Sequence, residues 1–109
     1  MLIDFEKLDK NTLKNFRGGE KEVSAQIFFD GKVKIMKALL IPGSSIGMHT
    51  HETSSEIIYV LKGRGKILTP EGEEPLNEGL CHYCPKGESH SLINTGDEDL
   101  IVFTVVPEG

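Results

Sequence analysis

Between residues 23 and 106 the chain alternates short apolar runs with turn residues, and this alternation constrains its fold more than any other feature. We expect strands over residues 23–29, 32–41, 48–51, 56–61, 65–69, 80–84, 89–93 and 100–106. Asp30-Gly31, between the first two runs, is a strong signal for a two-residue hairpin. Many short strands predict an all-β sandwich or barrel, and the pattern alone leaves an immunoglobulin-like sandwich open beside a jelly roll.

Residues 1–20 differ from the strand-rich remainder. Their apolar residues recur mostly in steps of three, which favours a short helix or turn with Asn11 or Thr12 as its cap. Gly18-Gly19 then ends this segment. A chain of 109 residues fits one domain. We therefore expect an N-terminal segment over residues 1–20 that packs on a single barrel domain over residues 21–109.

Two spaced signatures lie within residues 43–94. The first consists of Gly43, His49, His51, Glu56 and Gly63, and the second of Gly79, Pro85, Gly87, His90 and Asn94. Because alternate residues of a strand share a face, His49 and His51 point the same way. Glu56 opens the next run, and His90 comes from a distant one, so the fold can bring four polar side chains together.

At every defining position these signatures resemble the two motifs of the cupin superfamily, and they cover about half of the chain. The resemblance is to a small single-domain cupin. It implies an all-β double-stranded β-helix, or jelly-roll barrel, and so chooses among the folds that the strand pattern left open.

The residue types and the resemblance together predict a centre of three histidines and one glutamate. We expect His49, His51, Glu56 and His90 to bind one divalent transition metal ion per chain. Such ligands suit iron, manganese, cobalt, nickel, copper or zinc, and the likeness to 2-His-1-carboxylate sites favours iron or manganese. Four ligands leave two positions of a six-coordinate ion free, so we expect an open site rather than a closed structural zinc site.

A substrate pocket is expected beside these ligands. His82 departs from the usual cupin pattern and is a candidate general acid or base, or a hydrogen-bond partner of a ligand. The alternative is a buried imidazole bonded to a backbone carbonyl. Glu56 is a second candidate for carrying a proton, beside its role as a ligand. Strand alternation assigns the remaining pocket wall to Met36, Ile58, Val60, Cys84, Leu92 and Phe103.

These features favour a metal-dependent enzyme of the dioxygenase, isomerase or lyase type, acting on a small oxygen-rich molecule that the metal chelates. The resemblance does not choose among these reactions, because the cupin fold also includes proteins that are not enzymes. The alternative is a non-catalytic, metal-containing module that binds or senses a small molecule.

Charge and hydropathy limit the partners. Seventeen acidic against twelve basic residues give a formal charge of −5, which disfavours nucleic acid. No run of 18 apolar residues predicts a membrane span, and the first residues lack the apolar stretch of a signal peptide, so we expect a cytoplasmic protein. Ile57, Tyr59 and Leu61 form an apolar row on the outward face. This row predicts cover from the N-terminal segment or from a second subunit, as in a homodimer.

Overall fold

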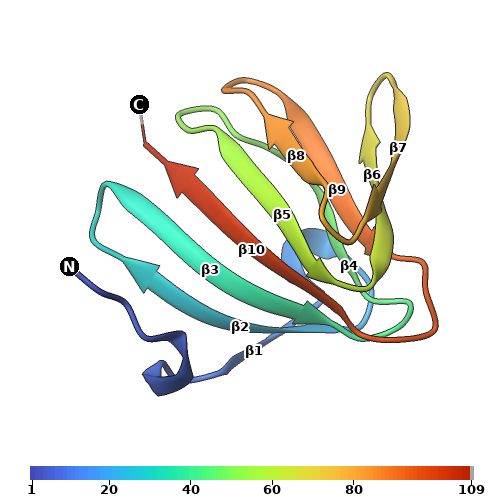
Figure 1. The fold of residues 1–109 in the computed structure, drawn as a ribbon. Coiled ribbons are helices and arrows are strands. Elements are labelled where there is room, and N and C mark those ends of the chain that lie inside the picture. The colour runs from blue at the N-terminus through green and yellow to red at the C-terminus, as the bar shows by residue number, and fades with distance from the viewer. Residues whose placement is uncertain (109) are drawn as a thin grey trace.

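The computed structural model describes residues 1–108 as two antiparallel β-sheets (Figure 1). The larger sheet has the strand order β1-β2-β3-β10-β5-β8, and the smaller sheet has the order β4-β9-β6-β7. The strands are β1 (Asn11–Lys14), β2 (Glu22–Phe29), β3 (Val33–Leu40), β4 (Ser45–Thr50), β5 (Glu56–Lys62), β6 (Arg64–Thr69), β7 (Gly72–Asn77), β8 (Cys81–Cys84), β9 (Ser89–Asn94) and β10 (Leu100–Pro107). The helical segments of residues 1–108 are two 3-10 turns, η1 (Phe5–Lys7) and η2 (Phe16–Gly18), and neither is long and apolar enough to cross a membrane. The prediction of an all-β fold is confirmed.

The core lies between the two sheets, and alternation along the strands builds it. On β10 every second residue from Leu100 to Val106 is buried, and on β5 the inward residues are Glu56, Ile58 and Val60. The core cluster consists of Val23, Ala25, Met36, Ala38, Leu40, Ile46, Ile58, Val60, Ile67, Leu76, Leu92, Leu100 and Val102. Glu56 interrupts the apolar row at the start of β5, so one end of the interior is polar.

The N-terminal residues form less helix than the spacing predicts. Asn11–Lys14 is strand β1, which pairs with β2, so Asn11 and Thr12 begin a strand rather than cap a helix. Upstream, the Gln26 side chain holds η1 on the larger sheet, because its Nε2 donates to the Phe5 carbonyl oxygen. Pairing with the sheet thus overrides the local three-residue pattern.

Phe103 lies on the outer face of the larger sheet, so its prediction as a pocket residue is wrong. Its ring meets that of Phe5 edge to face, with centroids 5.8 Å apart. The residues on either side, Val102 and Thr104, are buried, and Thr104 takes the inward position. Because both faces of β10 are apolar, the sequence does not distinguish them, and a shift of one residue exchanges them.

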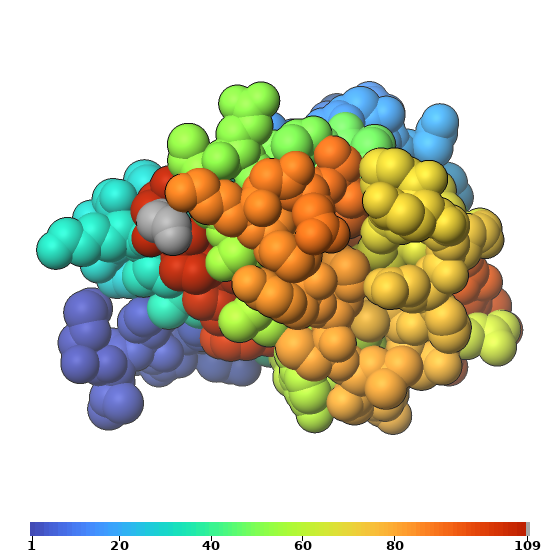
Figure 2. Space-filling view, turned by 90° about the horizontal axis from the view of Figure 1, so that it is seen from above, coloured from blue at the N-terminus to red at the C-terminus, as the bar shows by residue number. Residues whose placement is uncertain are grey.

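Strand β7 has no counterpart among the apolar runs. Leu76 is its buried residue, and its other positions, Pro75 included, are exposed. Proline cannot donate to a sheet ladder and is tolerated at an edge, and β7 is the edge strand beside β6. In Figure 2 the yellow surface of β6 and β7 lies directly against the orange surface of β8 and β9. An edge position therefore permits a polar strand that pattern reading does not detect.

Candidate metal centre

The four predicted ligands meet at the polar end of the interior. His49 lies on β4, His51 directly follows that strand, Glu56 opens β5 and His90 lies on β9. His49 pairs with His90 across the smaller sheet. The ligand atoms of all four residues lie within 4.8 Å of one another. The structure therefore brings together the complete set of residues that the two signatures predict.

A bulge in β4 aims His49 into the interior. Ile46 pairs with Leu92 whereas His49 pairs with His90, so three steps along β4 match two along β9. Gly47 lies within this shift, and its carbonyl oxygen accepts a hydrogen bond from His49 Nδ1 at 2.8 Å. Bulges of this kind re-aim side chains beside functional sites. The bulge thus sets both the direction and the tautomer of His49.

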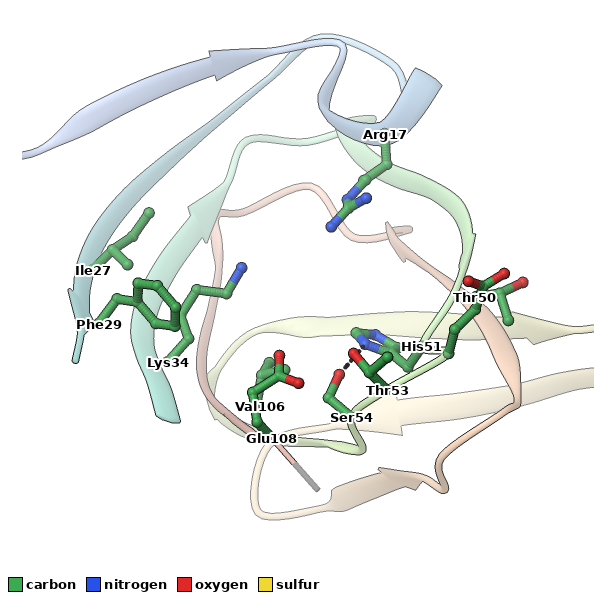
Figure 3. A pocket seen from close by; sticks show the side chains of 11 residues that line it. Arg17, Ile27, Phe29, Lys34, Thr50, His51, Thr53, Ser54, Val106 and Glu108 are labelled. Atoms are coloured by element: carbon green, nitrogen blue, oxygen red, sulfur yellow. Dashed lines mark hydrogen bonds between the residues drawn. The ribbon is translucent and has the colours of Figure 1, made fainter. Parts of the chain in front are cut away.

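The three histidines direct their Nε2 atoms toward one point. A carbonyl oxygen can only accept, so His49 carries its proton on Nδ1 and has a lone pair on Nε2. His51 Nδ1 lies 3.3 Å from Ser54 Oγ, a contact drawn in Figure 3. His51 Nε2 lies 3.1 Å from His49 Nε2 and 3.0 Å from His90 Nε2. Lone pairs this close repel unless a cation, either a metal ion or an added proton, lies between them.

Glu56 supplies negative charge to the cluster. Its Oε1 lies 2.7 Å from His90 Nε2, 2.9 Å from His51 Nε2 and 3.9 Å from His49 Nε2. Burial acts to raise the pKa of this carboxyl, but the three imidazoles around it outweigh burial and bring the pKa far below its ordinary value. Glu56 is therefore a carboxylate at neutral pH, which suits a metal ligand better than a proton donor.

The separations fit the donor atoms of a six-coordinate divalent ion. With bonds of about 2.1 Å, adjacent donors lie about 3.0 Å apart and opposite donors about 4.2 Å apart. The four shorter separations, from 2.7 to 3.1 Å, match adjacent positions. The 3.9 Å between His49 Nε2 and Glu56 Oε1 approaches the opposite arrangement. Three imidazoles and a carboxylate thus fit one divalent transition metal ion.

Two adjoining cavities lead to these ligands. An inner cavity of about 30 Å³ touches all four, and an outer cavity of about 490 Å³ opens beside His51. Arg17 and Lys34 line both cavities. Figure 3 shows Arg17, from η2, and Lys34, from β3, projecting into the space over His51. The ion pairs of residues 1–108 involve neither cation, so both charges are available to a ligand.

The predicted pocket residues divide between the inner cavity and the core. Met36, Ile58 and Leu92 line the inner cavity. Val60 lies in the core cluster and lines neither cavity. Cys84 is a buried free thiol that also lines neither cavity. Burial, together with the charge of Glu56, raises its pKa to about 11, so it stays protonated and packs beside the centre.

His82 contacts a ligand rather than a cavity. Its Nε2 lies 3.1 Å from His90 Nδ1, and its Nδ1 lies 3.1 Å from Glu74 Oε1. Both ring nitrogens of His82 therefore bond to side chains, and neither bonds to a backbone carbonyl as the alternative interpretation expected. Burial and the nearby charge of His90 lower the pKa of His82, so its ring is neutral at pH 7. Of the two roles considered for His82, the geometry favours hydrogen bonding to a ligand over proton transfer to a substrate.

Sequence reasoning missed Arg17, Lys34 and Glu74. Lys34 alone had a usable signal, because it shares the alternation of Met36 and the other inward residues of β3. Arg17 lies in a turn with a left-handed backbone, at φ 57°, and a single charge in a turn follows no pattern. Glu74 lies on the edge strand β7, and the polar sequence of this strand gives no alternating apolar pattern from which a strand could be predicted.

Comparison with known proteins points to the same family as the paired signatures. Residues 36–106 match a family model described as "Cupin domain". The chain is 33% identical over 112 residues to the "Oxalate-binding protein" of Thermotoga maritima, covering 97% of this chain and 93% of that protein. It is also 33% identical over 92 residues to a glucose-6-phosphate isomerase of Thermococcus onnurineus, covering 72% of this chain but 48% of that protein.

A solved structure shows the same fold. The crystal structure of a predicted oxalate decarboxylase from Thermotoga maritima superposes with a TM-score of 0.93 at 31% identity, and the match covers 100% of both chains. The paired signatures, the two-sheet architecture and these matches together show that the chain belongs to the cupin domain family.

Proposed function

We propose that this cupin holds one divalent transition metal ion and binds a small dicarboxylate of the oxalate type at that ion. The observation that carries the proposal is the lining of the inner cavity, where Arg17 and Lys34 face the four candidate ligands. A dianion can meet the metal centre at one end and these cations at the other. The bound ion would supply a Lewis acid that two neighbouring oxygens can chelate.

Charge balance favours an anionic ligand. Glu56 is the one acidic residue that lines the inner cavity within residues 1–108. A divalent ion, Arg17 and Lys34 therefore leave about three positive charges uncompensated there. Glu52 and Glu108 line the outer cavity only, so the positive excess lies at the inner end. A hydrogen bond to a charged group contributes roughly 1.5–3 kcal/mol, which makes each cation a measurable part of recognition.

The two cavities limit the size of the ligand. The inner cavity of about 30 Å³ has room for little more than water. A larger ligand must therefore extend into the outer cavity of about 490 Å³, along the path that Arg17 and Lys34 line. A two-carbon dicarboxylate requires the least extension. We favour iron or manganese as the metal, because the donors are imidazole nitrogen and carboxylate oxygen.

The name of a relative supports the same ligand class. The Thermotoga maritima protein, 33% identical across 97% of this chain, is named for oxalate binding. Because that match spans nearly both chains, we assign the same ligand class here as a proposal.

Turnover of the bound anion by lyase-type decarboxylation is the second candidate. The likeness to a predicted oxalate decarboxylase, at 31% identity over 100% of both chains, favours it. Such a reaction needs a proton donor. Glu56 is a carboxylate, and His82 lies outside both cavities. Glu52 and Glu108 both line the outer cavity, and we assign this role to Glu52, because it directly follows the candidate ligand His51 in the chain.

Titration calorimetry with oxalate tests the binding proposal on protein loaded with Mn(II). We expect one ion per chain and one oxalate per ion. Arg17→Gln and Lys34→Gln should each weaken oxalate binding roughly 10–100-fold without loss of metal, since each removes one charged hydrogen bond. His90→Ala should lose metal and oxalate binding together. Lys37→Gln is the matched control, because Lys37 lies on β3 opposite the outward-facing Phe103.

Equal oxalate affinity in metal-free protein would contradict the proposal. Wild-type affinity in both cation variants would contradict it as well. NMR detection of formate in the same samples separates turnover from binding. Formate that appears with wild type and stops in Glu52→Gln would establish the second candidate.

A further inference from the structure

Three hydrogen-bonded side chains lead from the surface to the metal centre. Glu74 on β7 accepts a hydrogen bond from His82 Nδ1 on β8 at 3.1 Å. His82 Nε2 in turn accepts one from His90 Nδ1 on β9 at 3.1 Å. Side-chain exposure falls from 61% at Glu74 to 8% at His82 and 2% at His90. Since β7 and β8 are edge strands of different sheets, this hydrogen-bonded chain joins the two sheets beside the site.

Donor and acceptor types indicate which nitrogen carries the proton at each step from Glu74 to His90 Nδ1. An ionised carboxylate only accepts, so His82 carries its proton on Nδ1. The neutral His82 ring then has a lone pair on Nε2, which accepts from His90 Nδ1–H. His90 Nε2 then faces the centre, 2.7 Å from Glu56 Oε1, where a metal ion would take the place of the proton that these two atoms share. Glu74 thus selects which nitrogen of His90 faces the centre.

We propose that Glu74 and His82 are positioning residues that hold the ring and tautomer of His90 ready for a metal ion. The inference rests on the metal site of the proposed function, and neither residue belongs to the two signatures. Histidine ligands are commonly oriented through their second nitrogen, and loss of the orienting partner typically weakens metal binding by roughly 10–100-fold. Here the His82 imidazole lies between the Glu74 carboxylate and His90, so that a residue of an exposed edge strand can orient a buried histidine.

A second metal site is the competing interpretation of these residues. Ligand atoms of His82, Cys84 and His90 lie within 4.8 Å of one another. Existing hydrogen bonds argue against this site, because the two imidazoles already face each other as donor and acceptor. The Cys84 thiol donates to the Glu88 carbonyl oxygen at 3.6 Å. A second ion would break these contacts, whereas the positioning role keeps every group paired.

The test compares Glu74→Ala, Glu74→Gln and His82→Ala, with Zn(II) affinity measured by chelator competition. Nitrogen-15 NMR of the metal-free protein reports the His90 tautomer. Glu74→Ala and His82→Ala should weaken Zn(II) binding by roughly 10–100-fold and mix the tautomers. Glu74→Gln keeps an acceptor oxygen and should restore most of the affinity. Glu73→Gln is the control, because Glu73 is the neighbour of Glu74 on β7 and pairs with Lys66 instead.

Several results would overturn the inference. One is wild-type affinity together with a wild-type tautomer in both Glu74→Ala and His82→Ala. Another is two ions per wild-type chain, one of them lost in Cys84→Ser, which would establish the second metal site. If His82→Ala does not fold, Glu74→Ala decides, because that side chain is 61% exposed. If the wild-type chain takes up no ion, the proposed function fails, while the metal-free tautomer still confirms or refutes the positioning role.

Discussion

Replacing Gly47 by alanine tests whether the contact between η2 and β4 holds Arg17 over the candidate metal centre. Gly47 lies in the β4 bulge that aims His49, and the backbone of Arg17 packs directly on it. A Cβ added at Gly47 would lie 2.0 Å from the Arg17 carbonyl oxygen and 2.8 Å from its carbonyl carbon. Ordinary Cβ contacts do not come closer than 3.0 Å. The obstacle is backbone, so the segment that carries Arg17 has to shift by about 1 Å.

The magnitude follows from this overlap. Forcing an extra methyl group into a packed contact costs roughly 1–3 kcal/mol. Taking about 2 kcal/mol, and about 4–8 °C per kcal/mol for a domain near this size, Tm should fall by roughly 8–16 °C. The same shift moves the Arg17 side chain away from the inner cavity. Oxalate affinity should therefore fall about as far as in Arg17→Gln.

Thermal unfolding followed by circular dichroism, and oxalate titration, measure the two effects. Gly96→Ala is the control, because a Cβ there would meet side-chain atoms only, at 3.2 Å or more. Suppose Gly47→Ala melts within about 3 °C of the control and binds oxalate like the wild type. The contact between η2 and β4 would then not hold Arg17 over the centre, and the reasoning would be refuted.

Two further predictions concern alkaline pH and association. Burial and the charge of Glu56 raise the pKa of Cys84 from 9.0 to about 11, so stability should fall between these pH values, by up to roughly 3 kcal/mol, as the unfolded thiol ionises before the folded one. Denaturant unfolding of wild type and Cys84→Ala measures this, and an equal loss in both would contradict it. Ile57, Tyr59 and Leu61 remain 38–43% exposed, so we propose that a second copy covers them. Light scattering should give twice the 12.0 kDa chain mass and a monomer for Tyr59→Lys, and a monomeric wild type would refute the dimer.

The sequence by itself indicated most of the strands and the four candidate metal ligands, because the strands and the pairing of His49 with His51 follow from local spacing. The strand expected over residues 56–61 is observed as β5, Glu56–Lys62. His49 and His51 share a face through alternation alone, and no distant contact is needed to infer it. His90 was identified through its spacing from the preceding turn and through the resemblance of the paired signatures to a known family.

Only the tertiary structure decided what surrounds those ligands. A one-residue change of register would exchange the faces of Phe103 and Thr104. Because both faces of β10 are apolar, its sequence does not show which register the strand adopts. Arg17 reaches the cavity because Gly47 lets two backbones touch. Glu74 reaches His82 because the edges of the two sheets close on each other. In each case the deciding contact depends on how strands pair and how the sheets pack, so the spacing of residues along one strand holds no information about it.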